Sequence, residues 1–170
     1  MTIHQPLRVL GLSTAILGLG TVAPAAQTPD ACAPFTVTSD GSQRTVEYFD
    51  IGSDGPGAGD MRIGRRALID EAGNSVGHHR WVLVHLDPPP GSGERSESYG
   101  MHVLSLDDGQ IHYQVLTEVV ESPEKTERAS VGGFTGIIVG GTGAYSFARG
   151  TVDLSVDGLN SSHAFNIRCD

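Results

Sequence analysis

A glycine-rich stretch, Val139–Leu154, constrains the fold more than any other part of the chain. It carries Gly140, Gly141 and Gly143 between an apolar run and an alternating run that begins at Tyr145. Glycine permits positive φ and a close approach of backbones that a Cβ resists, so this pattern predicts a tight turn between two strands. A phosphate-binding loop would need Lys-Ser or Lys-Thr after the glycines, or a G-x-G-x-x-G spacing that opens a helix. The stretch therefore indicates β-structure and not nucleotide binding.

The remaining sequence alternates short runs rich in Val, Ile, Thr, Tyr and Phe with turn residues, among them 23 Gly and 9 Pro. After a short opening strand over 33–38 and a turn at 39–42, the predicted strands span 45–51, 60–69, 76–86, 98–106, 111–120, 133–139, 145–156 and 163–169. Loops are expected at 52–59, 88–93 and 121–130. Roughly eight strands in up-and-down order are typical of a small closed antiparallel barrel, whose interior holds side chains or one small ligand. A two-layer sandwich is the alternative.

Length and charge narrow the function. The 170 residues fit one domain, long enough to bury a core. A net charge of −9 would repel a phosphate backbone or an anionic membrane surface. Nucleic acid is therefore not an expected partner.

The first 26 residues have the composition of a secretory signal peptide. Arg8 precedes the uncharged run Val9–Val22, and Ala23–Ala26 supplies small residues for cleavage. The alternative is a membrane anchor, but a spanning helix needs about 20 apolar residues and this run is shorter. We expect an extracellular protein, free of the membrane after cleavage, with a single domain over 27–170.

The two cysteines, Cys32 and Cys169, lie at opposite ends of the expected mature chain. In an exported protein such a pair predicts a disulfide, which would join the first strand to the last and favours the barrel. Two free thiols are the alternative.

Three blocks of sequence resemble the allene oxide cyclase and dirigent families. The first runs from Gly59-Asp60 through Leu68-Ile69-Asp70 to Val76-Gly77, and the second is Asp108-Gly109-Gln110-Ile111. The third is the glycine-rich stretch, where Val-Gly-Gly-Thr-Gly, an aromatic residue and Ala-Arg-Gly are similar to the sequence motif of the dirigent family. The blocks cover most of the mature chain in the order that these families share.

The resemblance implies an eight-stranded barrel, commonly trimeric, with a largely hydrophobic cavity and no cofactor. Such proteins steer a reactive precursor into one stereochemical product, by cyclisation of an allene oxide or by coupling of phenoxy radicals. Related bacterial barrels form spirocyclic or Diels–Alder products in natural product biosynthesis. The expected partners of this chain are thus a small hydrophobic molecule and further copies of itself, as a trimer or dimer.

The cavity residues of the cyclases match this chain in part. Their cavity glutamate falls at Glu47, which is present, whereas the asparagine two residues further on falls at Phe49. A second asparagine falls at Arg66, a cysteine at Leu83 and a tyrosine at Thr117. These departures argue against the allene oxide reaction and leave the fold and the one-substrate cavity as expectations.

The same matching predicts which side chains point inward. Glu47, Arg66 and His79 are the expected catalytic residues. The expected substrate-binding residues are Phe49, Arg62, Trp81, His85, Tyr99, Met101, Tyr113 and Val115. Glu47 beside Arg66 would form a charge-stabilised or proton-transfer pair, or alternatively a salt bridge that plugs the barrel.

The remaining candidate residues have weaker signals. His79 suits acid–base work at neutral pH, but a hydrogen-bonded wall residue is an equally ordinary role. His102 and His112 are expected on the face opposite His79, so a metal site is not predicted. Arg149, after the glycines, is expected to anchor their turn.

Three functions fit this sequence. The first is a cofactor-free cyclase or isomerase that controls stereochemistry by confining a hydrophobic, oxygenated precursor. The second is a non-catalytic carrier with the same cavity. The third is a structural protein with a filled barrel, which a cavity under about 300 Å³ would favour.

Overall fold

The computed structural model describes residues 32–51, 57–86, 95–121, 128–130 and 132–170. The predicted signal peptide, 1–26, lies outside the described residues. So do the predicted loop at 88–93 and parts of the loops at 52–59 and 121–130. In the described part of the chain, no helix is long and apolar enough to span a membrane.

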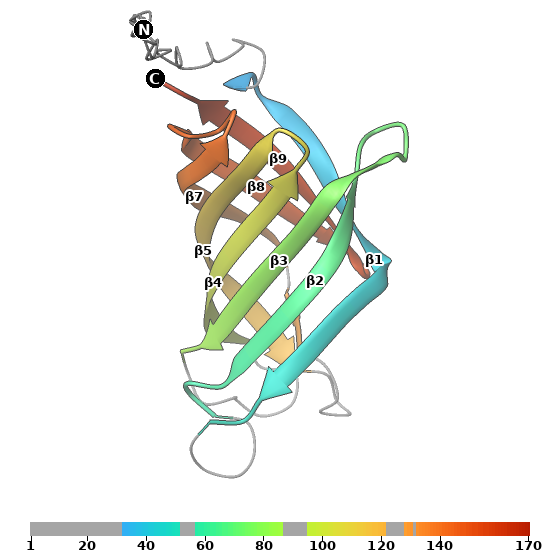
Figure 1. Cartoon of the computed structure of the whole chain (residues 1–170). Helices are drawn as coiled ribbons and strands as arrows, with labels where there is room; N and C mark the ends of the chain where they lie inside the picture. Colours follow the sequence, from blue (N-terminus) through green and yellow to red (C-terminus); the bar gives the residue numbers. More distant parts are fainter. Residues whose placement is uncertain (1–31, 52–56, 87–94, 122–127, 131) are drawn as a thin grey trace, which may run out of the picture.

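The described chain is a closed antiparallel β-barrel, as predicted (Figure 1). Its strands are β1 (Phe35–Phe49), β2 (Met61–Ile69), β3 (Ser75–His85), β4 (Arg95–Leu106), β5 (Gly109–Glu121), β6 (Arg128–Ser130), β7 (Gly133–Gly143), β8 (Arg149–Asp157) and β9 (Asn160–Arg168). The strand order is β4-β3-β2-β1-β9-β8-β7-β5-β6, and the β4–β5 hairpin closes the ring. Eight strands form the barrel, and the short β6 extends the pairing along the end of β5.

The three glycines of the glycine-rich stretch, Gly140, Gly141 and Gly143, lie at the end of β7 and against β5, where Gly141 pairs with Ile111. A Cβ on Gly141 would lie 2.4 Å from the Gln110 carbonyl oxygen, so this close approach of backbones requires glycine. The chain does not reverse at the glycines, where the turn was predicted, but after them, through 144–148, because backbone hydrogen bonds such as Ala148 N–H to the Tyr145 carbonyl (2.9 Å) hold a compact turn there. The strand that leaves the turn thus begins at Arg149, whose side chain is exposed, and not at Tyr145.

β1 differs from the sequence prediction, which placed a turn at 39–42 between two strands. It is one strand of 15 residues with a bulge between Asp40 and Thr45. The Asp40 carboxylate accepts hydrogen bonds from the backbone N–H (2.8 Å) and hydroxyl (2.9 Å) of Ser42, which stabilise this local bend. A bulge changes the alternation of side chains along a strand. Val46 therefore faces the interior after the bulge, as Val37 does before it.

The hydrophobic core fills one end of the barrel. Its members come from β1, β2, β4, β5, β7, β8, β9 and the turn at 144–148, and include Leu68, Leu104, Ile111, Tyr145, Val152 and Phe165. Phe35 stacks on Phe165 with ring centroids 4.9 Å apart. This end is closed by packed side chains, so a ligand would have to enter elsewhere.

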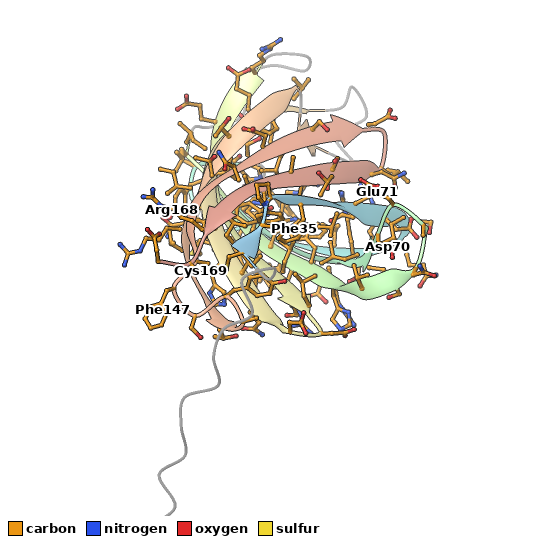
Figure 2. The ribbon with its side chains drawn as sticks, turned by 90° about the horizontal axis from the view of Figure 1, so that it is seen from above. Phe35, Asp70, Glu71, Phe147, Arg168 and Cys169 are labelled. Atoms are coloured by element: carbon orange, nitrogen blue, oxygen red, sulfur yellow. A yellow bond between two sulfur atoms is a disulfide. The ribbon has the colours of Figure 1, made fainter. Side chains whose placement is uncertain are left out.

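A disulfide joins Cys32 to Cys169 at the core end, with the two Cα atoms 5.8 Å apart. Seen from above, Cys169 lies close to the start of β1 and on the opposite side of the ring from Asp70 and Glu71 (Figure 2). The predicted pairing of the two cysteines is confirmed, and it ties the beginning of β1 to the end of β9.

The other end is more open because β9 is shorter than β1. β9 pairs with β1 only along Phe35–Ser39, whereas the second half of β1 pairs with β2 alone. The turn at Gly158 and Leu159, between β8 and β9, borders the resulting opening.

The outer face of the sheet carries exposed apolar side chains on several strands. They include Ile63 (41%) on β2, Met101 (45%) on β4, Leu116 (54%) on β5 and Ile137 (65%) on β7. Assembly into a trimer or dimer stays a prediction from the sequence.

Candidate functional site

A cavity of about 310 Å³ lies inside the barrel between the packed core and the second half of β1. Its apolar wall includes Trp81, Leu83, Val115, Phe134, Leu154 and Val156. Its polar wall includes Arg44, Arg62, Arg66, His79, His102 and Ser161. Apolar walls with a few convergent polar groups are typical of small-molecule sites.

The sequence predicted five of these lining residues. Arg62, Arg66, His79, Trp81 and Val115 all line the cavity. Two further predictions, Tyr113 and His85, also face the interior but are not part of the cavity wall. Tyr113 packs beneath the cavity within the core, and His85 lies 2.7 Å (Nδ1) from the Ser98 hydroxyl.

Glu47 and Phe49 do not face the cavity, contrary to the prediction. Glu47 pairs with Ile63 and lines a shallow depression on the outer face of the barrel. The reason is the bulge in β1, which turns Arg44 and Val46 inward and leaves Glu47 and Phe49 exposed. The structure therefore does not bring Glu47 and Arg66 together, and neither the proton-transfer pair nor the salt bridge forms.

Tyr99 and Met101 are also on the outer face. Met101 pairs with Val82 on one side and Gln114 on the other, and all three point outward. The inward residues of β4 are instead Ser98, Gly100 and His102, since successive side chains of a strand alternate between its faces. The prediction that His102 faces away from His79 was wrong for the same reason.

Five buried side chains form one hydrogen-bonded chain across the barrel interior, in the order Tyr113, His163, Ser39, His79 and His102. The phenol oxygen of Tyr113 lies 3.0 Å from His163 Nδ1, and His163 Nε2 lies 3.0 Å from Ser39 Oγ. Ser39 Oγ lies 2.9 Å from His79 Nδ1, and His79 Nε2 lies 2.8 Å from His102 Nδ1. β5, β9, β1, β3 and β4 thus contribute one residue each, and only the barrel's closure brings them together.

The three histidines of this hydrogen-bonded chain, His79, His102 and His163, are held in the neutral form. Burial lowers the pKa of His102 and His163 to about 3. Electrostatic interaction with neighbouring His163 and Arg66 lowers the pKa of His102 further. The pKa of His79 lies well below its usual value for the same first reason, desolvation. Burial raises the pKa of the Tyr113 phenol, so Tyr113 keeps its proton at neutral pH.

Arg66, in the cavity wall, is connected through Ser161 to the chain of hydrogen bonds. Its Nη1 donates to Ser161 Oγ (3.2 Å), and Ser161 Oγ lies 3.1 Å from His163 Nε2. Its guanidinium carbon lies 4.9 Å from the centre of the Trp81 ring, within cation–π range. Burial lowers the pKa of Arg66 from its usual high value, but an arginine remains charged at neutral pH.

The indole of Trp81 packs closely against Gly64, which it can do because residue 64 has no side chain. A Cβ on Gly64, its cross-strand partner, would lie 2.0 Å from an indole carbon. Gly100 similarly leaves room for His102, whose Nε2 would be 2.5 Å from an added Cβ. These two glycines shape the cavity.

Within the described residues, no group of three His, Cys, Asp or Glu side chains is arranged to hold a metal ion. His79, His102 and His163 form hydrogen bonds to one another and to hydroxyl groups, and these bonds occupy five of their six ring nitrogens.

Several residues of the site were missed from the sequence. Ser39 fell in a predicted turn, and His163 fell at the start of a predicted strand. Ser161 fell in no predicted element. His163 had a usable signal, because it alternates with Phe165 and Ile167, two buried apolar residues. Ser39 had none, since its position depends on a bulge.

Comparison with known proteins defines the fold. No family model and no curated protein sequence matches the chain. The solved structure of a pyocyanin demethylase is similar, with 23% identity and a TM-score of 0.60 over 80% of this chain and all of that one. The Diels Alderase AbmU from Streptomyces koyangensis is also similar, with 16% identity and a TM-score of 0.52.

The chain shares their fold. It covers 63% of the Diels Alderase chain, with 81% of its own residues aligned. At these identities the similarity shows a shared barrel fold, and it does not transfer the activity of either protein to this chain.

Proposed function

We propose that this protein binds one small hydrophobic, oxygenated precursor inside its barrel and steers its stereoselective cyclisation, without a cofactor. The observation that carries the proposal is the cavity, an apolar chamber of about 310 Å³ whose polar groups, Arg66 and His102, lie among rigid aromatic and aliphatic walls. Confinement of a flexible molecule between such walls lowers the entropy cost of ring closure.

The similar structures support this proposal at the level of architecture. The barrel of AbmU belongs to a Diels Alderase, so this architecture can host a ring-forming reaction. The pyocyanin demethylase barrel belongs to an enzyme with a different reaction. A member of the allene oxide cyclase and dirigent group, exported by its first 26 residues and acting in natural product biosynthesis, is our more specific proposal.

The alternative is a carrier that binds the same molecule without changing it. The cavity volume lies just above the lower end of ordinary ligand sites, about 300 Å³, and so argues against a barrel filled by its own side chains. Cavity volume alone does not distinguish a carrier from a cyclase, and the experiment must therefore measure product.

The test uses achiral, linear molecules that each join a diene to an enone and cyclise slowly on their own. Rate and enantiomeric excess are measured with and without the protein. We expect a single enantiomer in excess and a faster reaction, both lost in Trp81→Ala, which removes one wall. Met101→Ala, on the outer face, is the control and should behave as the unmodified protein does. Tight binding with racemic product at the uncatalysed rate would instead establish the carrier.

A further inference from the structure

Two nitrogen atoms of the cavity wall are buried without a hydrogen-bond partner among the described residues. They are His102 Nε2 and Arg66 Nε. His102 is only 7% exposed, and both side chains line the cavity. Leaving a buried polar atom unpaired is unfavourable, so two such atoms around one chamber indicate where a ligand's polar atom binds.

The chain of hydrogen bonds determines whether His102 Nε2 is a donor or an acceptor. Tyr113 is 1% exposed, and among the described residues its phenol oxygen bonds only to His163 Nδ1. If His163 Nδ1 carried a proton, the buried phenol proton would have no acceptor, which is unfavourable. Tyr113 therefore donates to His163 Nδ1, and the single proton of neutral His163 is on Nε2.

The direction of every later bond follows from this one. His163 Nε2–H faces the hydroxyl oxygens of Ser39 and Ser161, so neither hydroxyl can donate to that nitrogen, and the Ser39 hydroxyl donates to His79 Nδ1 instead. The His79 proton is then on Nε2 and is donated to His102 Nδ1. Neutral His102 is left with its proton on Nε2, at the cavity wall.

The charge of the cavity favours an electron-rich ligand. Among the described residues, its lining contains three arginines and no carboxylate, in a protein of net charge −9. A cationic ligand would lie close to the half-buried guanidinium of Arg66, whereas an oxygen with full or partial negative charge would be attracted to it.

We propose that the cavity binds an apolar molecule by a carbonyl-type oxygen, of a ketone or a carboxylate, held by His102 Nε2–H and Arg66 Nε–H. Tyr113 acts as a positioning residue, because its proton sets the direction of the chain that makes His102 a donor. This inference rests on the proposed function, since it takes the cavity as the substrate site and names the class of substrate.

Such donors would also assist the proposed reaction. Hydrogen bonds to a conjugated carbonyl oxygen withdraw electron density from the adjoining double bond and stabilise negative charge that develops on the oxygen. Because the donors are fixed by the barrel, they need little rearrangement as that charge grows.

The binding test uses three naphthalenes of nearly equal shape: 2-acetylnaphthalene, 2-naphthoate and 2-isopropylnaphthalene. Their dissociation constants are measured by calorimetry. We expect the ketone and the carboxylate to bind at least about tenfold more tightly than the hydrocarbon, the effect of one hydrogen bond of about 1.4 kcal/mol. His102→Leu and Arg66→Met should each reduce this preference, and His112→Leu, on the outer face, should leave it unchanged.

The second test reads the histidine proton directly. Nitrogen-15 spectra of histidine-labelled protein should show His102 protonated on Nε2 and not on Nδ1. Tyr113→Phe removes the donor to His163 while retaining the ring, so His102 should then show a mixture of both forms. A tyrosine that only fills space would not change this signal when replaced by phenylalanine.

The outcomes separate this inference from the proposed function. Equal affinity for all three naphthalenes would overturn the donor pair and leave the cavity as a ligand site. No binding of any of them would overturn the cavity as a ligand site, and the inference with it. A wild-type His102 protonated on Nδ1 would overturn the direction of the chain.

Discussion

At the scale of single residues, burial decides the chemistry of the site. His79, His102 and His163 are neutral because the barrel interior excludes the water that would stabilise their charged forms. Neutral histidines can relay a fixed direction of hydrogen bonding, because each then carries one donor and one acceptor.

This burial predicts a dependence of stability on pH. In the unfolded chain each histidine takes up a proton below a pH of about 6.5, but in the fold His102 and His163 do so only near pH 3. The unfolded state thus binds more protons between these values, and the free energy of unfolding should fall on acidification by up to about 1.4 kcal/mol per pH unit for each histidine. Above about pH 6.5 these histidines should contribute no pH dependence.

Urea denaturation between pH 7.5 and 4.5 measures this slope. His163→Gln should remove about one histidine's share of it. His112→Gln, on the outer face, is the matched control. Equal slopes for the two variants would show that His163 is not kept neutral by the fold.

Gly64→Ala tests how the cavity wall is packed. The added Cβ would overlap the indole of Trp81, so the ring has to move and the free energy of unfolding should fall by about 1–3 kcal/mol. Because Trp81 is the only tryptophan, its fluorescence should shift to longer wavelength as it becomes exposed. Gly133→Ala is the control, since its added Cβ would have a nearest neighbour at 3.3 Å. Unchanged fluorescence in Gly64→Ala would contradict this packing.

At the scale of elements, β1 decides which residues meet. Its second half is held by Asp60, whose buried carboxylate accepts hydrogen bonds from the Tyr48 hydroxyl and the backbone N–H groups of Ile51 (2.9 Å) and Gly57 (2.5 Å). Asp60 thereby fastens the end of β1 to the start of β2, on one side of the cavity.

Asp60→Ala should therefore loosen this wall. Hydrogen bonds to a charged group contribute about 1.5–3 kcal/mol each, so the free energy of unfolding should fall by about 3 kcal/mol or more. Hydrogen exchange of the β1 amides over 44–49 should become faster. Asp70→Ala, in the exposed β2–β3 turn, should have the smaller effect. Equal losses in the two variants would show that Asp60 does not hold β1.

The elements also explain what could be predicted from the sequence. The alternation of the β4–β5 hairpin and the turn at Asp107-Asp108-Gly109 suffice to place its strands. The inward set on β2, β3 and β5 was correct for Arg66, Trp81 and Val115. Glu47 was placed wrongly because the bulge adds an odd number of residues, three, to β1 and so reverses every later side chain, and local sequence does not reveal its position.

At the scale of the whole molecule, closure of the ring brings distant residues together. The disulfide between Cys32 and Cys169, 137 positions apart, contributes to that closure. Replacing both cysteines by serine should lower the free energy of unfolding by on the order of 4–5 kcal/mol, the loop-closure entropy of so long a loop. Denaturation of the double variant beside the oxidised protein checks this, and a loss below about 1 kcal/mol would show that the ends are held by packing alone.

The interior cavity is the proposed ligand site, and the outer depression near Met101 is the alternative ligand site. Intermolecular nuclear Overhauser effects from bound 2-naphthoate distinguish them in one spectrum. We predict contacts to the Trp81 indole and the Val115 and Leu83 methyl groups, which line the cavity. Contacts to the Met101 and Ile63 methyl groups alone would contradict a binding site inside the barrel.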